Sequence, residues 1–368
     1  MRKTLFSVLI LYLSGVFIQI NTVNAAEVTL LDESLVPVTS RSVAERNKAI
    51  SVALQNVVLK NSGSETALTH ASIQAKIKSP HSLIRQFGYD EIDGKLFLKV
   101  NFDHKRILAL LRAAELPVWG KQRPLTLIWL VEEGNDERQI INDASLVDSR
   151  QFFTQEAESK GVPLLFPLMD LDDNMQISVN DVRGMFVAQV DKASARYQTD
   201  YFVMASMSPN VDGVELSMSL FVKGSDEQSG IPLVSKRQIV TDTRAAVTEI
   251  ISSVSDYYVS RYAIADSGDK LNALVSFVDI TEMKQLVAIE KYLNQLSVVK
   301  EVSVSQLHST NVQYHLSLFG TLDDLHRLMV LDPRVIQTQS EYQSEDDSSH
   351  IDDTDSAEFK ELEYHWRG

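Results

Sequence analysis

Residues 162–181 read VPLLFPLMDLDDNMQISVND, and the way this stretch folds decides the architecture of the middle of the chain. Asp170, Asp172 and Asn174 stand at the first, third and fifth positions of a calcium-binding EF-hand loop. An EF-hand needs a helix before this loop, but the two prolines of VPLLFPLM break a helix. We therefore predict a strand that delivers Asp170 to the edge of a sheet, followed by a loop and then a helix.

Metal binding is the weaker interpretation of this stretch. An EF-hand loop has a glycine at its sixth position for a sharp turn, and Met175 stands there instead. If Met175 adopted the left-handed conformation, the strain of about 1–2 kcal/mol would weaken binding roughly 5- to 30-fold. We predict no cofactor and keep Asp170, Asp172 and Asn174 as the candidate ligands, because the carboxyl edge of an open α/β sheet commonly binds ligands.

Strands and helices alternate on both sides of this stretch. The order is βαβαβ, which favours a partly parallel sheet with right-handed crossovers, and an antiparallel hairpin and a long helix follow it. The resulting α/β unit has predicted strands at 125–131, 162–168, 201–207, 214–222 and 231–239, and predicted helices at 148–160, 182–197 and 241–263.

A smaller α+β unit is predicted on each side, so the fold class is α+β and α/β, multidomain. The first contains a hairpin at Asp93-Gly94, and the other resembles half of a ferredoxin-like domain. The first unit has strands at 27–35, 83–89 and 95–102 and helices at 41–60, 66–78 and 103–115. The other has strands at 273–278, 298–307 and 313–320 and helices at 282–295 and 322–331.

Composition marks the remaining segments. Two prolines and a glycine in LPVWGKQRP predict a linker. The final stretch carries ten acids against Lys360 and Arg367, which predicts disorder, and its aromatic end is either a docking motif or incidental. The predicted organisation is a signal peptide at 1–25, an α+β domain at 26–115, a linker at 116–124, an α/β domain at 125–265, a small α+β domain at 270–335 and a disordered acidic tail at 338–368.

The charge and the amino-terminal residues bear on partners and compartment. A net charge of −15 disfavours the phosphate attraction that nucleic-acid binding needs. Arg2 and Lys3 precede an apolar run at 5–20 and small residues up to Ala26, which is the pattern of a signal peptide cleaved after Ala25. An uncleaved anchor helix is the alternative. We predict the periplasm of a Gram-negative bacterium and no transmembrane segment after cleavage.

Catalytic signatures are missing from the chain. It contains no cysteine, so it has no disulfide, no thiol nucleophile and no attachment point for a lipoprotein anchor. Its histidines lack zinc-hydrolase spacing, and the Ser-x-x-Lys at Ser297 and Lys300 lacks the partner motifs of penicillin-recognising enzymes. We predict no catalytic residues and favour an interaction protein over an enzyme.

Four residues are predicted as interaction candidates: Trp119, Arg123, Trp129 and Asp200. The two tryptophans bracket the linker and the first strand of the α/β unit. Such rings either lock a domain joint by burial or form a recognition platform for a peptide or glycan. Asp200 closes a predicted helix onto a strand and is expected to hold that turn.

A set of residues spread over the chain suggests a family. They are Arg46, Ser62-Gly63, Val118-Trp119-Gly120, Arg123-Pro124, Trp129, Pro167 to Asp170, Arg196-Tyr197 and Asp200. With them the chain resembles the uncharacterised proteobacterial domain of unknown function 2066 over residues 27–335, a resemblance that implies no activity. The middle domain more remotely resembles the amino-terminal domain of the Tol-system propeller protein and the lipoprotein activators of peptidoglycan synthases, and flagellar assembly protein T combines somewhat similar modules.

Two functions follow as expectations. The first is a non-enzymatic periplasmic adaptor that binds an envelope protein during cell-envelope assembly. The alternative is a hydrolase or ligand-binding protein with an acidic, divalent-metal site at Asp170 and Asp172.

Overall fold

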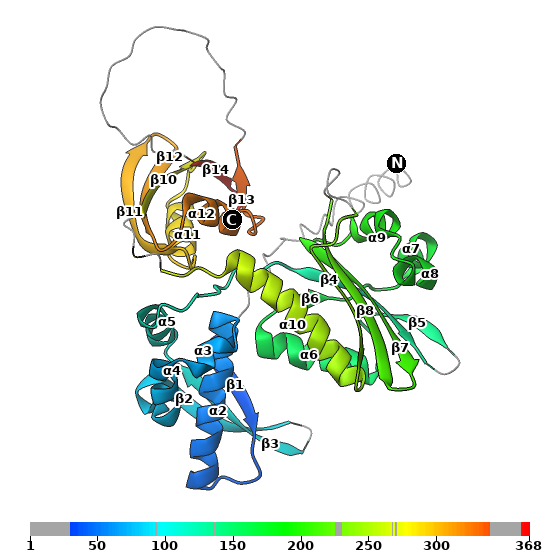
Figure 1. Ribbon diagram of the computed structural model, residues 1–368. Coiled ribbons are helices and arrows are strands. Elements are labelled where there is room, and N and C mark those ends of the chain that lie inside the picture. The colour runs from blue at the N-terminus through cyan, green and yellow to red at the C-terminus, as the bar shows by residue number, and fades with distance from the viewer. Residues whose placement is uncertain are drawn as a thin grey trace, which may run out of the picture.

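A computed structural model describes residues 30–338 and 362–368, apart from residues 93, 135–136, 225–229, 267 and 269–270. The predicted signal peptide and most of the predicted tail therefore lie outside the described residues. The described part is a mixed α+β structure with three sheets, which Figure 1 shows as three groups of strands. No helix in this part is both long enough and apolar enough to cross a membrane.

The first sheet is antiparallel, in the order β1-β3-β2, and helices cover one of its faces. The side chain of Ser42 caps the long helix α2 at its start, and Gly63, at φ 67°, ends it in the left-handed conformation that glycine tolerates best. Asp103 caps α5 as its side chain accepts from Arg106 N. The elements are β1 (Glu33–Pro37), α2 (Val43–Ser62), α3 (Thr66–Thr69), α4 (Ala71–Lys78), a short 3₁₀ turn (Pro80–Leu83), β2 (Ile84–Ile92), β3 (Lys95–Phe102) and α5 (His104–Ala113).

Two predictions for this unit were wrong in detail. The first strand begins at Glu33, later than predicted, because the chain makes a turn at Leu30, whose φ is +65°. The helix predicted at 66–78 is interrupted at His70, which is extended and serves as the cap of α4.

The second sheet has the order β5-β4-β7-β8-β9, and β6 also pairs with β4. β4 is parallel to β6 and β7, while β5, β8 and β9 are antiparallel to their neighbours. Side chains of β4 alternate between two cores, with Ile128 facing α6 and α10 and Trp129 facing α7 to α9. The elements are β4 (Thr126–Glu133), β5 (Arg138–Ile141), α6 (Asp148–Lys160), β6 (Leu164–Leu165), α7 (Leu171–Gln176), α8 (Val179–Arg183), α9 (Val187–Ser194), β7 (Tyr201–Asn210), β8 (Gly213–Val222), β9 (Val234–Val240) and α10 (Thr243–Tyr262).

The stretch at 162–181 is a strand that ends in an acidic turn, as predicted, but the strand is short. β6 has only two residues, because the flanking prolines, Pro163 and Pro167, have no N–H to donate to a sheet ladder. The segment predicted as a solvated loop forms α7, and the predicted helix at 182–197 is split into α8 and α9 at Met185, whose φ is +56°. The short strand β5 was not predicted.

The third sheet has the order β11-β12-β10-β14-β13 and includes two strands that were not predicted. β14 comes from the last residues of the chain, which lie inside the predicted tail. For those five residues the prediction of disorder is wrong, because Tyr364 and Trp366 are buried in the sheet. The elements are β10 (Leu271–Val278), α11 (Met283–Leu293), β11 (Val299–His308), β12 (Asn311–Leu318), α12 (Leu322–Met329), β13 (Val335–Gln337) and β14 (Leu362–Trp366).

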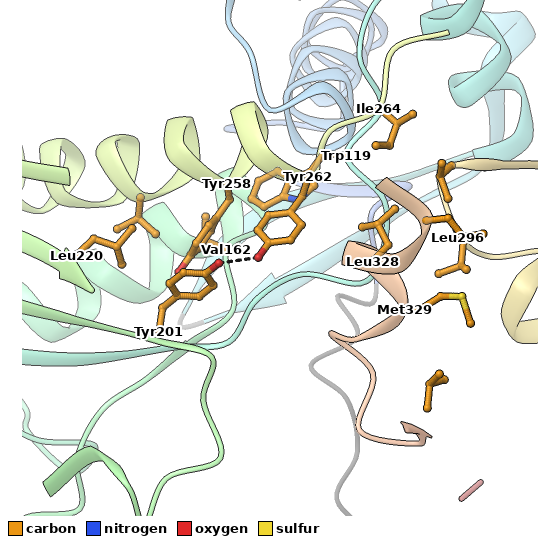
Figure 2. Close-up of a cluster of buried hydrophobic side chains, with 14 of the residues drawn as sticks. Trp119, Val162, Tyr201, Leu220, Tyr258, Tyr262, Ile264, Leu296, Leu328 and Met329 are labelled. Atoms are coloured by element: carbon orange, nitrogen blue, oxygen red, sulfur yellow. Dashed lines mark hydrogen bonds between the residues drawn. The ribbon is translucent and has the colours of Figure 1, made fainter. Parts of the chain in front are cut away.

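One apolar core runs from the second sheet into the third. Figure 2 shows Trp119 beside Tyr262, whose hydroxyl is 2.6 Å from that of Tyr201, with Leu296 and Leu328 of the third unit nearby. The predicted linker at 116–124 passes through this region, since both its Val118 and Trp119 are buried. The linker is therefore part of the packed interior and not an exposed connection.

Candidate functional site

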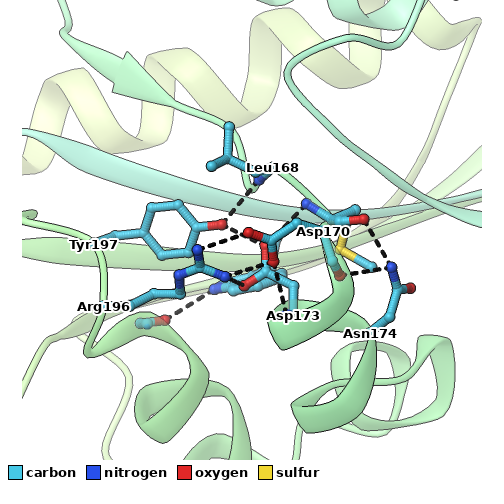
Figure 3. Close-up of polar contacts among 9 residues, drawn as sticks. Leu168, Asp170, Asp173, Asn174, Arg196 and Tyr197 are labelled. Carbon is cyan, nitrogen blue, oxygen red and sulfur yellow. Dashed lines mark hydrogen bonds and ion pairs between the residues drawn. The ribbon is translucent and has the colours of Figure 1, made fainter. Parts of the chain in front are cut away.

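The acidic turn after β6 is a closed ion-pair network. Arg196 donates from Nη1 to Asp170 Oδ1 at 2.6 Å and from Nη2 to Asp170 Oδ2 at 2.8 Å. It also reaches Asp173 Oδ1 at 3.0 Å, and the hydroxyl of Tyr197 donates to Asp173 Oδ2 at 2.5 Å. Figure 3 shows the guanidinium and the phenol converging on the two carboxylates. Both Asp170 oxygens are thus occupied by one arginine.

The pKa shifts of these groups follow from their contacts. The hydrogen bonds from Arg196 lower the pKa of Asp170 to about 2, and the same bonds raise the pKa of Arg196. Burial, followed by its bond to Asp173, raises the pKa of Tyr197 and keeps the phenol neutral. The side chain of Asp170 also caps α7 as it accepts from Asp173 N at 3.1 Å.

The other two candidate metal ligands are not directed at a common centre. Asn174 uses its amide nitrogen to donate to the carbonyls of Met169 and Asp170, and Asp172 is exposed. Among the described residues, no group of three or more histidine, aspartate or glutamate side chains is placed to hold a metal ion. The arrangement holds the turn between β6 and α7 in place. Its central acid, the buried Asp173, was not among the predicted candidates.

Trp129 and Asp200 both make structural contacts around the second sheet. Trp129 is fully buried, donates from Nε1 to Ser194 Oγ at 2.9 Å and meets Tyr197 edge-on. Asp200 Oδ2 accepts from Leu125 N at 2.9 Å, and burial raises the pKa of this carboxyl. Asp200 therefore has a structural role, but it holds the start of β4 against the start of β7 and not the turn that was expected.

Arg123 is the most unusual of the predicted residues. It is 2% exposed, its guanidinium lies 3.8 Å from the centroid of the Trp119 ring, and burial lowers its pKa to about 9, so it stays charged at neutral pH. Its partners are all carbonyl oxygens: those of Lys60, Trp119, Gly120, Lys160 and Gly161.

Those carbonyls explain why a cation is stable there. Lys60 lies in the last turn of α2, while Lys160 and Gly161 lie at the end of α6. The carbonyls at a helix carboxyl end lack intrahelical donors, and the helix dipole makes that end negative. Arg123 thus caps α2 of the first unit and α6 of the second at once. We call this contact the arginine joint.

A second arginine ties the first unit to the third. Arg112, from α5, donates to the carbonyls of Ile264 and Ser297 at 2.5 and 2.6 Å, and its guanidinium lies 4.1 Å from the centroid of the Phe319 ring. Next to it, Val118 and Ile264 pair through both of their backbone N–H groups. The three units consequently meet around the segment predicted as a linker.

This burial decides between the alternatives left open for the tryptophans. Trp119 and Trp129 have no exposed surface and Arg123 has almost none, so in this arrangement none of them can form a recognition platform. They lock a joint and a core instead. Their prediction as partner-contacting residues does not match their placement, because a sequence reveals an aromatic residue but not which segments cover it.

A cleft of about 900 Å³ lies between the first sheet and α6. This volume is at the upper end of the range for ligand pockets, which is about 300–1,000 Å³. Its floor contains the T-shaped pair of Phe153 and Phe166, 5.3 Å apart between centroids, and Arg150 lies over the Phe166 ring. β1 and α2 supply the facing wall, including Leu35 and Lys60. The cleft therefore runs along the joint of two units, behind which Arg123 is buried.

The rim of the cleft is apolar and exposed. Leu30, Leu35 and Ile92 line it with exposed fractions of 57%, 42% and 45%. Apolar side chains gathered around a hollow mark a binding surface more often than the same side chains scattered singly. We call the hollow and these three residues the rim cleft.

One edge of β1 is open toward the rim cleft. Phe102 N donates to Asp32 O and Val38 N to Leu96 O, so the even-numbered residues of β1 bond to β3. The backbone N–H and C=O of Leu35 consequently point away from β3, and Leu35 lines the cleft. Glu33 O on the same edge already accepts from Lys60 Nζ, and Pro37 has no N–H, so the edge offers the backbone groups of Leu35 to an extended segment of a partner.

Comparison with known proteins finds family matches in the third unit and in the first. Residues 271–349 match the model of the DUF2066 family. The predicted resemblance to domain of unknown function 2066 is confirmed for this segment. The DUF2066 match begins at residue 271, where residue 27 was predicted, and ends at residue 349, where residue 335 was predicted. Residues 25–120 match a different family, the domain of unknown function DUF8605. The residues that suggested DUF2066 lie outside its matched segment.

Beyond the DUF2066 segment, the comparisons find little. No curated protein matches the chain. The crystal structure of TolB from Acinetobacter baumannii matches over 42% of this chain and 32% of that chain, with 14% sequence identity and a TM-score of 0.23. The chain thus spans about a third of the length of TolB, and a likeness this weak carries no argument about function.

Proposed function

We propose that this protein is a non-catalytic adaptor of the bacterial periplasm, which binds an extended segment of an envelope protein in the rim cleft. The observation that carries the proposal is the cleft of about 900 Å³ between the first sheet and α6, with its exposed apolar rim. Apolar side chains supply the affinity of such a site, and the open edge of β1 at Leu35 supplies backbone hydrogen bonds.

The surroundings of the cleft suit a partner that is recognised by shape. Three of the four charged residues that line the cleft already have partners: Glu33 pairs with Lys99 at 2.9 Å, Arg150 pairs with Asp143 at 3.0 Å, and Lys60 Nζ donates to Glu33 O. The fourth, Glu158, is exposed, and the apolar rim supplies most of the remaining contact surface. A predominantly apolar peptide segment is therefore the expected occupant.

The periplasmic part of the proposal rests on the amino-terminal residues. Its support is the pattern of two basic residues, an apolar run and small residues before Ala26, together with the absence of cysteine. The test is fractionation of cells that express the full chain, followed by amino-terminal sequencing. The proposal expects the periplasmic form to start at Ala26, and a full-length form in the cytosol would contradict it.

The adaptor role is tested by photocrosslinking from inside the cleft. A photoreactive phenylalanine analogue replaces Leu35, and a matched control carries it at Val211, which is fully exposed in the turn between β7 and β8. After illumination of intact cells, the proposal expects a discrete adduct with an exported envelope protein from position 35 only.

Filling the cleft makes the test specific. Thr154 is exposed on α6 and lines the cleft, while Gln151 is exposed on the same helix outside it. Thr154→Trp should reduce the position-35 adduct at least about 10-fold, which corresponds to about 1.4 kcal/mol, and Gln151→Trp should leave it unchanged. An adduct that survives Thr154→Trp, or that forms equally from position 211, would show that the cleft is not the binding site.

A further inference from the structure

The strand β14 lies between β10 and β13, and neither of these strands is directly next to it in the sequence. It is parallel to β10, with Ser276 opposite Glu363, and antiparallel to β13, with Ile336 opposite His365. Figure 1 shows it inside the third sheet, between β10 and β13. We call the gap between β10 and β13 the strand slot.

The side chains of β14 fill the strand slot closely. Tyr364 is fully buried, and its hydroxyl lies 2.9 Å from Nδ1 of His326. Trp366 packs against Phe277 and Tyr292, with ring centroids 6.2 and 5.4 Å apart. Recognition thus uses backbone bonds for affinity and two aromatic side chains at alternate positions for specificity.

The polar contacts of β14 are also specific. The guanidinium of Arg334 lies 5.1 Å from the centroid of the Trp366 ring, and Asp279 approaches His365 Nδ1 at 3.2 Å. Thr338 N donates to Glu363 O, and Arg367 N donates to Arg334 O. The contacts of Trp366 and His365 therefore depend on the side chains of the strand, while the two backbone bonds hold it in place.

Chain connectivity does not dictate this position. Residues 339–361 separate Thr338 from Leu362, and a stretch of that length can span about 80 Å when fully extended. The DUF2066 match ends at residue 349, so it includes both walls of the slot but not the strand that fills it. Non-covalent contacts with the slot therefore hold β14 where it is, as they would hold a tethered ligand.

We propose that the strand slot is a peptide-binding site and that residues 362–366 are its tethered occupant. The partner that would replace β14 in the slot is an extended segment with one aromatic residue at the position of Tyr364 and another two residues later, at the position of Trp366. Such a segment adds to the open edge of β10 once β14 leaves. The proposal concerns a different surface from the rim cleft and does not depend on the adaptor role.

The buried indole N–H of Trp366 indicates which sequence would bind the slot at least as tightly as β14. Trp366 Nε1 is buried and finds no acceptor among the described residues. A buried donor without a partner is unfavourable, and phenylalanine at this place keeps the ring contacts without that donor. A strand with phenylalanine there should bind at least as tightly as the native sequence.

The test uses the full chain with a site-specific protease sequence at residues 346–352, which lie outside the described part. After cleavage and removal of the released fragment, the probe is a fluorescein-labelled peptide of residues 360–368, and its anisotropy reports binding. The cut protein should bind this peptide at least about 10-fold more tightly than the uncut protein, because the tethered strand competes at a high local concentration.

Peptide variants supply the controls. Combined Tyr364→Ala and Trp366→Ala should weaken binding to the cut protein at least about 10-fold, Trp366→Phe should not weaken it, and Glu363→Gln, at an exposed position, should have no effect. Equal binding to cut and uncut protein would place the peptide elsewhere. Failure of the labelled peptide to exchange, or loss of the near-ultraviolet circular dichroism of the cut protein when the fragment leaves, would make β14 an integral strand and overturn the proposal.

Discussion

Replacing Arg123 with methionine tests the arginine joint directly. The side chain keeps a similar length and can still cover the Trp119 ring, but it loses every donor. Five carbonyl oxygens, two of them in buried contacts and three in partly buried ones, then lack this partner. The substitution therefore removes the stabilisation that the hydrogen bonds of Arg123 provide, with little change in side-chain volume.

The expected magnitude follows from two opposing contributions. An unsatisfied buried acceptor costs about 1–3 kcal/mol. Because three of the five carbonyls are only partly buried, the lower end applies, and the loss is at most about 5 kcal/mol. Methionine avoids the desolvation of a buried cation, which offsets several kcal/mol of that loss. A net destabilisation of about 2–3 kcal/mol remains, which lowers the melting temperature by about 5–10 °C for a unit of 150–250 residues.

The assay is thermal unfolding followed by near-ultraviolet circular dichroism, to which the packed Trp119 contributes. A chain with several units need not unfold in a single step, so the transition that includes this signal is the one to compare. Arg237→Met is the matched control, because Arg237 is an exposed arginine paired with Glu215 and such pairs contribute about 0–1 kcal/mol. Arg123→Lys keeps the charge but has fewer donors, and it should melt between the two. If Arg123→Met melts within about 2 °C of Arg237→Met, the joint does not stabilise the protein as argued.

Three further results are expected. In chemical denaturation, Gly63→Ala should lower the free energy of unfolding by about 2–4 kcal/mol, because the backbone is left-handed and a Cβ there would lie 2.0 Å from Val259 Cγ2. Gly94 is also left-handed but has no neighbour within 4 Å, so Gly94→Ala should lower it by only about 1–2 kcal/mol. Asp170→Asn should lower the melting temperature at pH 7 but not near pH 2. The pKa of Asp170 in the folded protein, about 2, lies below the ordinary aspartate value of 3.8, so the stability that the carboxylate adds is present above pH 4 and is lost as the pH falls through 2. Calcium or magnesium should not raise the melting temperature of the unaltered protein, since Arg196 occupies both Asp170 oxygens, and a metal-dependent rise that Asp170→Asn abolishes would restore the metal-site alternative.

Part of the candidate site could be predicted from the sequence. The prolines before Asp170 indicated a strand in place of an EF-hand helix, and β6 and the capped α7 bear this out. This inference succeeds because proline and capping residues act on their immediate neighbours in the chain. Asp200 was expected to hold the turn before β7, but its side chain binds Leu125 N, 75 residues away in the sequence.

The partners of the buried charges could not be predicted in the same way. Arg123 contacts the ends of α2 and α6, which lie 63 and 37 residues away in the sequence. The one local hint was an arginine between a tryptophan and a proline. The rim cleft arises between two units, so no single segment carries its signature.

The local sequence by itself determined where most helices and hairpins begin and end. α6 spans the predicted residues, Gly63 ends α2, and Asp103 and Asp242 cap α5 and α10. Each of these outcomes depends on backbone preferences and on hydrogen bonds within a few residues, which the sequence displays directly.

Only the tertiary structure decided what the linker and the chain end do. The prolines and the glycine at 116–124 predicted an exposed connection, and the acidic composition predicted a disordered end. Trp119 and Tyr364 are nevertheless both fully buried. Burial depends on which distant segments supply apolar surface and free backbone groups, here the ends of two helices and the walls of the strand slot. Those contacts form between residues far apart in the chain, and neither periodicity nor composition records them.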